Sequence, residues 1–82
     1  MVEIVSEATL YAHPRGTSRV ERLKYSDGTV EYGVWVASGA HAEELLSAAQ
    51  RVPLRDDKGA PLEMAHMAYD GDTVGLIYRH VA

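Results

Sequence analysis

The chain has 82 residues, no cysteine and a formal net charge of −4 at pH 7. A chain of this length fits one domain with a small core, and folding hides about 60 to 65% of its surface. The absence of cysteine excludes disulfides, thiolate metal sites and thiol nucleophiles, so a core this small would benefit from self-association. The negative charge disfavours loose attachment to nucleic acid or anionic lipid, because both reward excess Lys and Arg. We therefore expect a single domain over residues 1–82, with a homodimer as one option.

The sequence has no run of ~18 uninterrupted apolar residues, which is what a membrane span needs. Near its start it carries Glu3 and Glu7, where a secretory leader would be basic. These two features predict a cytoplasmic protein that has no membrane partner.

The hydrophobic period is close to two almost everywhere except in one window, which is typical of a mostly β-sheet protein. A first strand is expected over 2–12, followed by a turn that contains Pro and Gly. Strands over 19–25 and 30–37 flank Asp27-Gly28, and this dipeptide between two such runs indicates a hairpin.

A two-residue loop at Asp27-Gly28 would set Lys24 opposite Glu31 and leave the other face of the hairpin apolar. In that register, four further residues share the face of the Lys24–Glu31 pair. They are Val20, Arg22, Gly33 and Trp35.

The period changes to helical spacing over residues 39–51. Ser38 is the expected N-cap of this helix, and Pro53 ends it. The apolar residues at helical spacing are Ala42, Leu45, Leu46 and Ala49. The pattern predicts a single helix that lies across one face of the sheet.

Beyond the helix, a short strand is expected over 52–55, and two longer strands over 62–69 and 73–81. The longer strands are joined through Asp70-Gly71-Asp72, and a three-residue loop there would set Glu63 opposite Arg79. In the same register, five residues of these two strands lie together on one face of the hairpin. They are Met67, Tyr69, Gly75, Ile77 and Val81.

The predicted fold is α+β, with a mostly antiparallel β-sheet of five to six strands in the chain order βββαβββ and one α-helix (39–51) packed on one face. A partly closed barrel plugged by the helix is the alternative.

No catalytic, cofactor-binding or metal-binding residue is predicted. In the expected register His66 and His80 lie about 13 Å apart along a strand, which is too far to share an ion. The segment from Ser38 to His41 holds the only local cluster with the atoms for nucleophilic catalysis, but it is not a nucleophile elbow. The acidic residues at 56–57 and 70–72 are typical of solvated turns.

Four basic residues suggest an alternative function, which is binding to single-stranded nucleic acid. They are Arg15, Arg19, Arg22 and Lys24, with Trp35 expected near Arg22 on one face. Acidic residues occur in the same hairpin, and such charge alternation is also typical of an ordinary solvated sheet face. Nucleic acid is therefore the less favoured partner.

The feature that most needs explanation is the apolar surface on the sheet face away from the helix. One helix covers one side only, and a large exposed apolar patch on a monomer of this size usually marks an interaction surface. The predicted protein interface consists of Trp35, Met67, Tyr69, Ile77 and Val81. A shift of either hairpin by one residue would move its side chains to the other face.

The sequence favours a non-enzymatic, acidic protein-binding module, a regulator or inhibitor that docks on another protein through its sheet. Phages and mobile elements use proteins of this size and charge to block host machinery, which is an association and not a motif. A third option is a small enzyme with a site at a subunit boundary, in which His66 or His80 acts as the general base.

Overall fold

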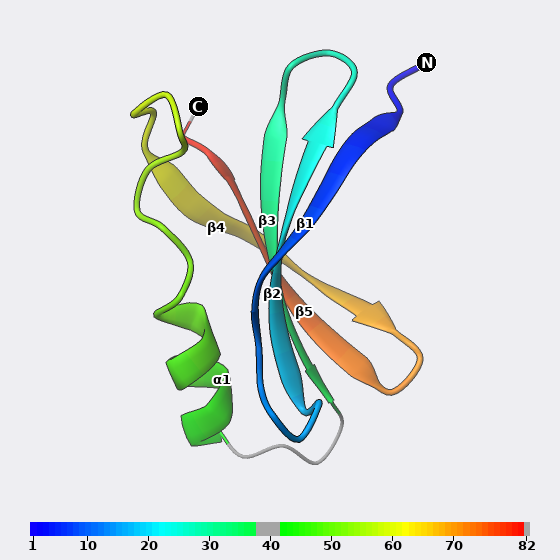
Figure 1. The fold of residues 1–82 in the computed structure, drawn as a ribbon, viewed down its shortest axis with the longest axis vertical. Coiled ribbons are helices and arrows are strands. Elements are labelled where there is room, and N and C mark those ends of the chain that lie inside the picture. The colour runs from blue at the N-terminus through cyan, green and yellow to red at the C-terminus, as the bar shows by residue number, and fades with distance from the viewer. Residues whose placement is uncertain (38–41, 82) are drawn as a thin grey trace.

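The computed structural model describes residues 1–37 and 42–81. Five strands form one antiparallel sheet in the order β1-β2-β3-β5-β4, with one helix against it (Figure 1). The elements are β1 (Ile4–Ala12), β2 (Ser18–Tyr25), β3 (Val30–Ala37), α1 (Ala42–Ala49), β4 (Leu62–Asp70) and β5 (Thr73–His80). This confirms the predicted α+β fold. The sheet is open, with β1 and β4 at its edges, so the barrel alternative is wrong.

The structure corrects two details of the predicted elements, which are the short strand after the helix and the end of the helix. The short strand expected over 52–55 is only a single bridge between Arg55 and Pro61, so the chain order is βββαββ. The helix ends before residue 51 because the backbone N–H of Arg51 donates to the carbonyl of Ala48, three residues back, which tightens the last turn.

The expected cap Ser38 and the cluster from Ser38 to His41 lie outside the described residues. Within the described part of the chain, no helix has the length and apolarity needed to cross a membrane.

The core lies between α1 and the two strands β2 and β3, on the side of the sheet that we call the helix face. Val20 and Val34 lie directly opposite each other there and are fully buried. Burying one such side chain contributes about 1.5–3 kcal/mol. The buried cluster consists of Val20, Val30, Tyr32, Val34, Val36, Ala48 and Val52. The opposite side of the sheet, which carries no helix, is called the open face.

The β2–β3 hairpin has a longer loop than the sequence suggested. Tyr25 and Thr29 are joined by a backbone hydrogen bond of 3.0 Å, so the loop is 26–28 and not Asp27-Gly28 alone. Gly28 takes a φ of 89°, a conformation that suits glycine at the end of a three-residue hairpin loop. The predicted two-residue loop is therefore wrong.

This change of loop moves the strand register by one residue. Lys24 lies opposite Val30, where Glu31 was expected. Since neighbouring side chains in a strand point to opposite faces, Val20 and Arg22 lie on the helix face, away from Trp35.

The β4–β5 hairpin starts in the predicted register and then leaves it. Glu63 lies opposite Arg79 as expected, but the register shifts between Met64 and His66, which makes Ala65 the extra residue of a bulge. Beyond the bulge, all residues of β4 up to the turn are moved by one position relative to β5. The loop has two residues instead of three, because Asp70 pairs with Thr73.

Candidate functional site

The bulge in β4 divides the predicted interface between the two faces of the sheet. Trp35 and Ile77 lie on the open face, whereas Met67 and Tyr69 lie on the helix face, opposite residues that continue the row of core valines. Val81 follows the end of β5 and is exposed. The expectation that these side chains share one face is therefore wrong, because the bulge in β4 moves Met67 and Tyr69 by one position.

Trp35 covers the centre of the open face. A Cβ atom placed on Gly33 would lie 2.7 Å from the indole nitrogen, and one on Gly75 would lie 2.6 Å from the six-membered ring. The indole therefore lies along the sheet over two glycines on neighbouring strands, which is the close packing that glycine inside a strand allows. Ile77, next to it on this face, is only 7% exposed. The open face thus shields its own largest apolar groups.

The four basic residues do not form one surface. Arg19 lies opposite Trp35, with its guanidinium 5.7 Å from the ring centroid, and also pairs with Glu21 at 2.5 Å. Arg22 and Lys24 are an odd number of residues further along β2, so they lie on the opposite side of the sheet, the helix face. Arg15 lies in the turn between β1 and β2. The expected proximity of Arg22 to Trp35 is wrong, since the hairpin register places Arg22 opposite Tyr32.

Exposed apolar side chains gather instead on the helix face of β4 and β5. Met64, Met67 and Tyr69 are 51%, 50% and 73% exposed. They lie opposite half-buried partners on β5, in three cross-strand pairs. These pairs are Met64–Tyr78, Met67–Leu76 and Tyr69–Val74, and we call the six side chains the β4–β5 surface.

The β4–β5 surface is uncovered because α1 is short and is held above the other half of the sheet. The helix has eight residues, which is a length of about 12 Å. Its Glu44 accepts a hydrogen bond from the Thr17 hydroxyl in the β1–β2 turn, with His13 3.9 Å away. Just beyond the helix, the Arg51 guanidinium lies 4.7 Å from the centre of the Tyr11 ring on β1. These contacts hold the helix near β1 and β2, far from the β4 edge.

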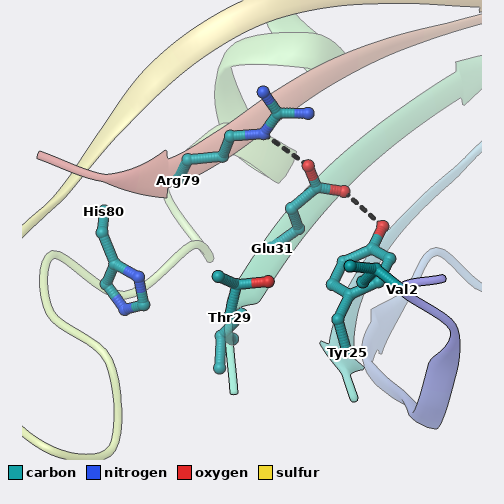
Figure 2. Close-up of a pocket in the computed structure, with 7 residues that line it drawn as sticks. Val2, Tyr25, Thr29, Glu31, Arg79 and His80 are labelled. Atoms are coloured by element: carbon teal, nitrogen blue, oxygen red, sulfur yellow. Dashed lines mark hydrogen bonds and ion pairs between the residues drawn. The ribbon is translucent and has the colours of Figure 1, made fainter. Parts of the chain in front are cut away.

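A pocket of about 490 Å³ opens at the end of the sheet where pairing between β3 and β5 stops at Tyr32 and Tyr78. Figure 2 shows Glu31 between Tyr25 and Arg79 at this pocket, with His80 on the other side. The lining residues are Val2, Tyr25, Thr29, Val30, Glu31, Arg79 and His80.

Glu31 organises the polar wall of the pocket. It accepts a hydrogen bond of 2.6 Å from the Tyr25 hydroxyl and one of 2.5 Å from Arg79 Nε. The bond to the Glu31 carboxylate, together with burial, raises the pKa of Tyr25 to about 12. Both carboxylate oxygens of Glu31 are thus used by these two contacts.

His80 forms the other polar contact of the pocket. Its Nε2 lies 2.5 Å from Asp56 Oδ2, and the Asp56 side chain is 4% exposed. Asp56 Oδ1 also accepts backbone hydrogen bonds from Lys58 and Ala60, at 2.9 and 2.8 Å. The hydrogen bond to His80, and then the backbone N–H groups, lower the pKa of Asp56. The turn expected at the acidic residues 56–57 is present, but Asp56 is buried and not solvated as expected.

No family model, curated protein or solved structure matches this chain. What the chain does must therefore be inferred from its own geometry. Among residues 1–37 and 42–81, no three His, Asp or Glu side chains converge as a metal ion would need. The pocket has a histidine held by a buried carboxylate, and the helix face carries the exposed apolar side chains of the β4–β5 surface.

Proposed function

We propose that this chain is an acidic, non-enzymatic module that docks on a partner protein through the β4–β5 surface, as a regulator or inhibitor. The observation that carries the proposal is the exposure of Met64, Met67 and Tyr69, each at least half exposed. They lie on the helix face of the edge strand β4, which is the face on which the core forms. Contiguous apolar patches of this kind on small soluble domains usually mark interaction surfaces.

The chemistry of the β4–β5 surface suits a protein partner. Methionine is flexible and polarisable, so it fits irregular apolar shapes. Tyrosine is enriched among the residues that contribute most binding energy at protein interfaces, because one end is apolar and the other can hydrogen-bond. No charged side chain interrupts the three cross-strand pairs. A partner with an apolar centre fits these six side chains.

The test is a comparison of two double variants that carry the same added charge. Met67→Lys with Tyr69→Lys alters the β4–β5 surface, whereas Val5→Lys with Leu10→Lys alters exposed positions of β1, the other edge strand. Proteins captured from the extract of the chain's own cells are identified with the wild-type chain and then measured against both variants. We expect the β4 variant to bind at least about tenfold more weakly, which is 1.4 kcal/mol or more. Equal binding by both variants would contradict the proposal.

The His80–Asp56 pair supports a second candidate, a small enzyme in which His80 is the general base. A carboxylate that orients a histidine at a pocket is one arrangement that general-base catalysis uses. Hydrolysis of a panel of activated esters by the wild type and by His80→Asn would test it. Rates that differ by about a hundredfold or more would favour the enzyme, because general-base catalysis contributes at least that much. Equal rates would remove this candidate.

A further inference from the structure

The outer edge of β4 has a segment that is complementary to itself. Residues 66–70 follow the bulge and pair with β5 without a further register shift. The strand is at the edge of the sheet, so its outer side faces no other strand among the described residues. Edge strands of this kind are templates for pairing with another chain.

We propose that a second copy of this chain pairs with the 66–70 segment, antiparallel and about a two-fold axis at Ala68. In this register His66 lies opposite Asp70 of the second copy, and Met67 lies opposite Tyr69 of the second copy. The inference rests on the proposed docking function, since both use β4. In this inference the protein bound at the outer edge of β4 is a second copy of the chain.

The faces of the sheet match in this register. Met67 and Tyr69 both belong to the helix face, while His66 and Asp70 both belong to the open face, opposite Ile77 and Thr73 of β5. Directly opposite residues of an antiparallel pair share one face, so each cross-strand contact joins side chains on the same side. A register shifted by one residue would put a helix-face residue opposite an open-face residue.

The side-chain chemistry is also complementary. A histidine faces a carboxylate twice, once on each side of the axis, and no like charges meet. Methionine and tyrosine face each other twice, which is a favourable sulfur–aromatic pairing. Moving the axis to Met67 would instead set Met64 opposite Asp70 across the bulge at Ala65. The axis at Ala68 is therefore the favoured one, and alanine there permits close approach.

The other edge of the sheet is less suited to a second copy. The register of β1 against β2 shifts twice, between Ile4 and Ser6 and between Thr9 and Tyr11. Bulges twist an edge strand away from further pairing, and they leave only the short stretch from Ser6 to Thr9 regular. The bulge of β4 lies at one end of its usable segment.

Pairing at β4 also enlarges the docking surface. The β4–β5 surfaces of the two copies would become neighbours, because Met67 of each copy contacts Tyr69 of the other on the helix face. The two α1 helices would lie at the outer ends of this joined surface. A partner protein would then meet one continuous apolar surface instead of two small ones.

The test uses the absence of cysteine from the chain. In Ala68→Cys, the two introduced sulfurs would face each other across the axis, where the Cα atoms of opposite residues are about 4.5–5.5 Å apart, within the range for a disulfide. Thr9→Cys on β1 is the matched control, and it is more exposed than residue 68. Random collisions would therefore favour the control. We expect most of the Ala68→Cys protein to form a disulfide dimer under mild oxidation, with little from Thr9→Cys.

The second test changes the charges at residues 66 and 70, both of which are exposed and lie outside the core. Asp70→Lys should weaken dimer formation in sedimentation experiments by about tenfold or more, since it sets a cation opposite His66. The double variant His66→Asp, Asp70→Lys restores opposite charges and should restore the dimer. Equal cross-linking at residues 68 and 9, or no rescue, would overturn the inference. The docking proposal fails separately, if the β4 and β1 lysine variants bind the partner equally.

Discussion

His80 Nε2 lies 2.5 Å from Asp56 Oδ2 and so joins the end of β5 to the turn that follows α1. The same carboxylate accepts the backbone N–H groups of Lys58 and Ala60, so one side chain fixes both the turn and its attachment to the sheet. Beside this turn, the backbone N–H of Leu62 donates to the carbonyl of Leu54. The segment between the helix and β4 is therefore held by these hydrogen bonds together with the burial of Val52 in the core.

Asp56→Asn should lower the melting temperature, and the loss should depend on pH. The hydrogen bond from His80 lowers the pKa of Asp56 below its ordinary value of 3.8. The carboxylate therefore stabilises the fold above that ordinary value, and this stabilisation is lost as the pH falls through the lower value of the folded state. Melting temperatures of the wild type and the variant should converge in acid. Parallel curves across the whole pH range would contradict a role for the Asp56 charge.

Tyr25 should be among the last tyrosines to ionise. Its hydrogen bond to Glu31 raises its pKa to about 12, because the phenolate would face a carboxylate. The stabilisation from the neutral hydroxyl is complete below the ordinary value of 10.0 and is lost as the pH rises through about 12. The ultraviolet difference between wild type and Tyr25→Phe isolates this titration. Glu31→Gln should move it toward 10.0, and an unchanged titration would show that Glu31 is not the cause.

Val20→Ala should be much more destabilising than an equivalent change at an exposed site. Val20 is fully buried opposite Val34. Removing its methyl groups should cost about 2 kcal/mol of unfolding free energy, whereas Leu10→Ala on the exposed edge should cost about 0.5 kcal/mol or less. Urea denaturation measures both values. Similar costs at the two sites would support the register predicted from the sequence, in which Val20 lies away from the core.

Gly75→Ala should disturb the packing of Trp35 and little else. The added Cβ would lie 2.6 Å from the indole, so the ring must move. Overpacking of this kind typically costs about 1–3 kcal/mol. The same change combined with Trp35→Leu should cost less than the sum of the two single changes, because the clash is removed. Simple additivity in urea denaturation would show that the indole does not lie over Gly75.

The alternating pattern of the sequence was sufficient to predict the number and type of the long elements, but it did not determine how they pair. In β2, one face carries Ser18, Val20, Arg22 and Lys24, and the other carries Arg19, Glu21, Leu23 and Tyr25. Neither set is clearly apolar, so the strand itself does not indicate which side is buried. An Asp-Gly dipeptide such as Asp27-Gly28 is compatible with both two-residue and three-residue hairpin loops. The local sequence of this hairpin therefore left its register open, and the observed register is the one that buries Val20 and Val34 under α1.

The candidate sites show the same limit. Exposure of Met67 and Tyr69 could be predicted from the apolar residues in β4, but the bulge at Ala65 that moves them to the helix face was not predicted. Without the bulge each side of this strand mixes apolar and polar residues, so the pattern did not indicate which side is buried. The pairing of His80 with Asp56 joins residues 24 positions apart through the arrangement of the sheet. Sequence spacing alone does not reveal such a contact.

Photo-cross-linking from Tyr69 tests the docking surface most directly. A photoreactive phenylalanine analogue replaces Tyr69 in one version of the chain and Leu10 in another, both of which are exposed edge-strand positions. We expect irradiation in the chain's own cells to give a discrete adduct with a protein other than a second copy of the chain from position 69, and none from position 10. Adducts from position 10 alone, or equal labelling from both positions, would contradict docking through the β4–β5 surface.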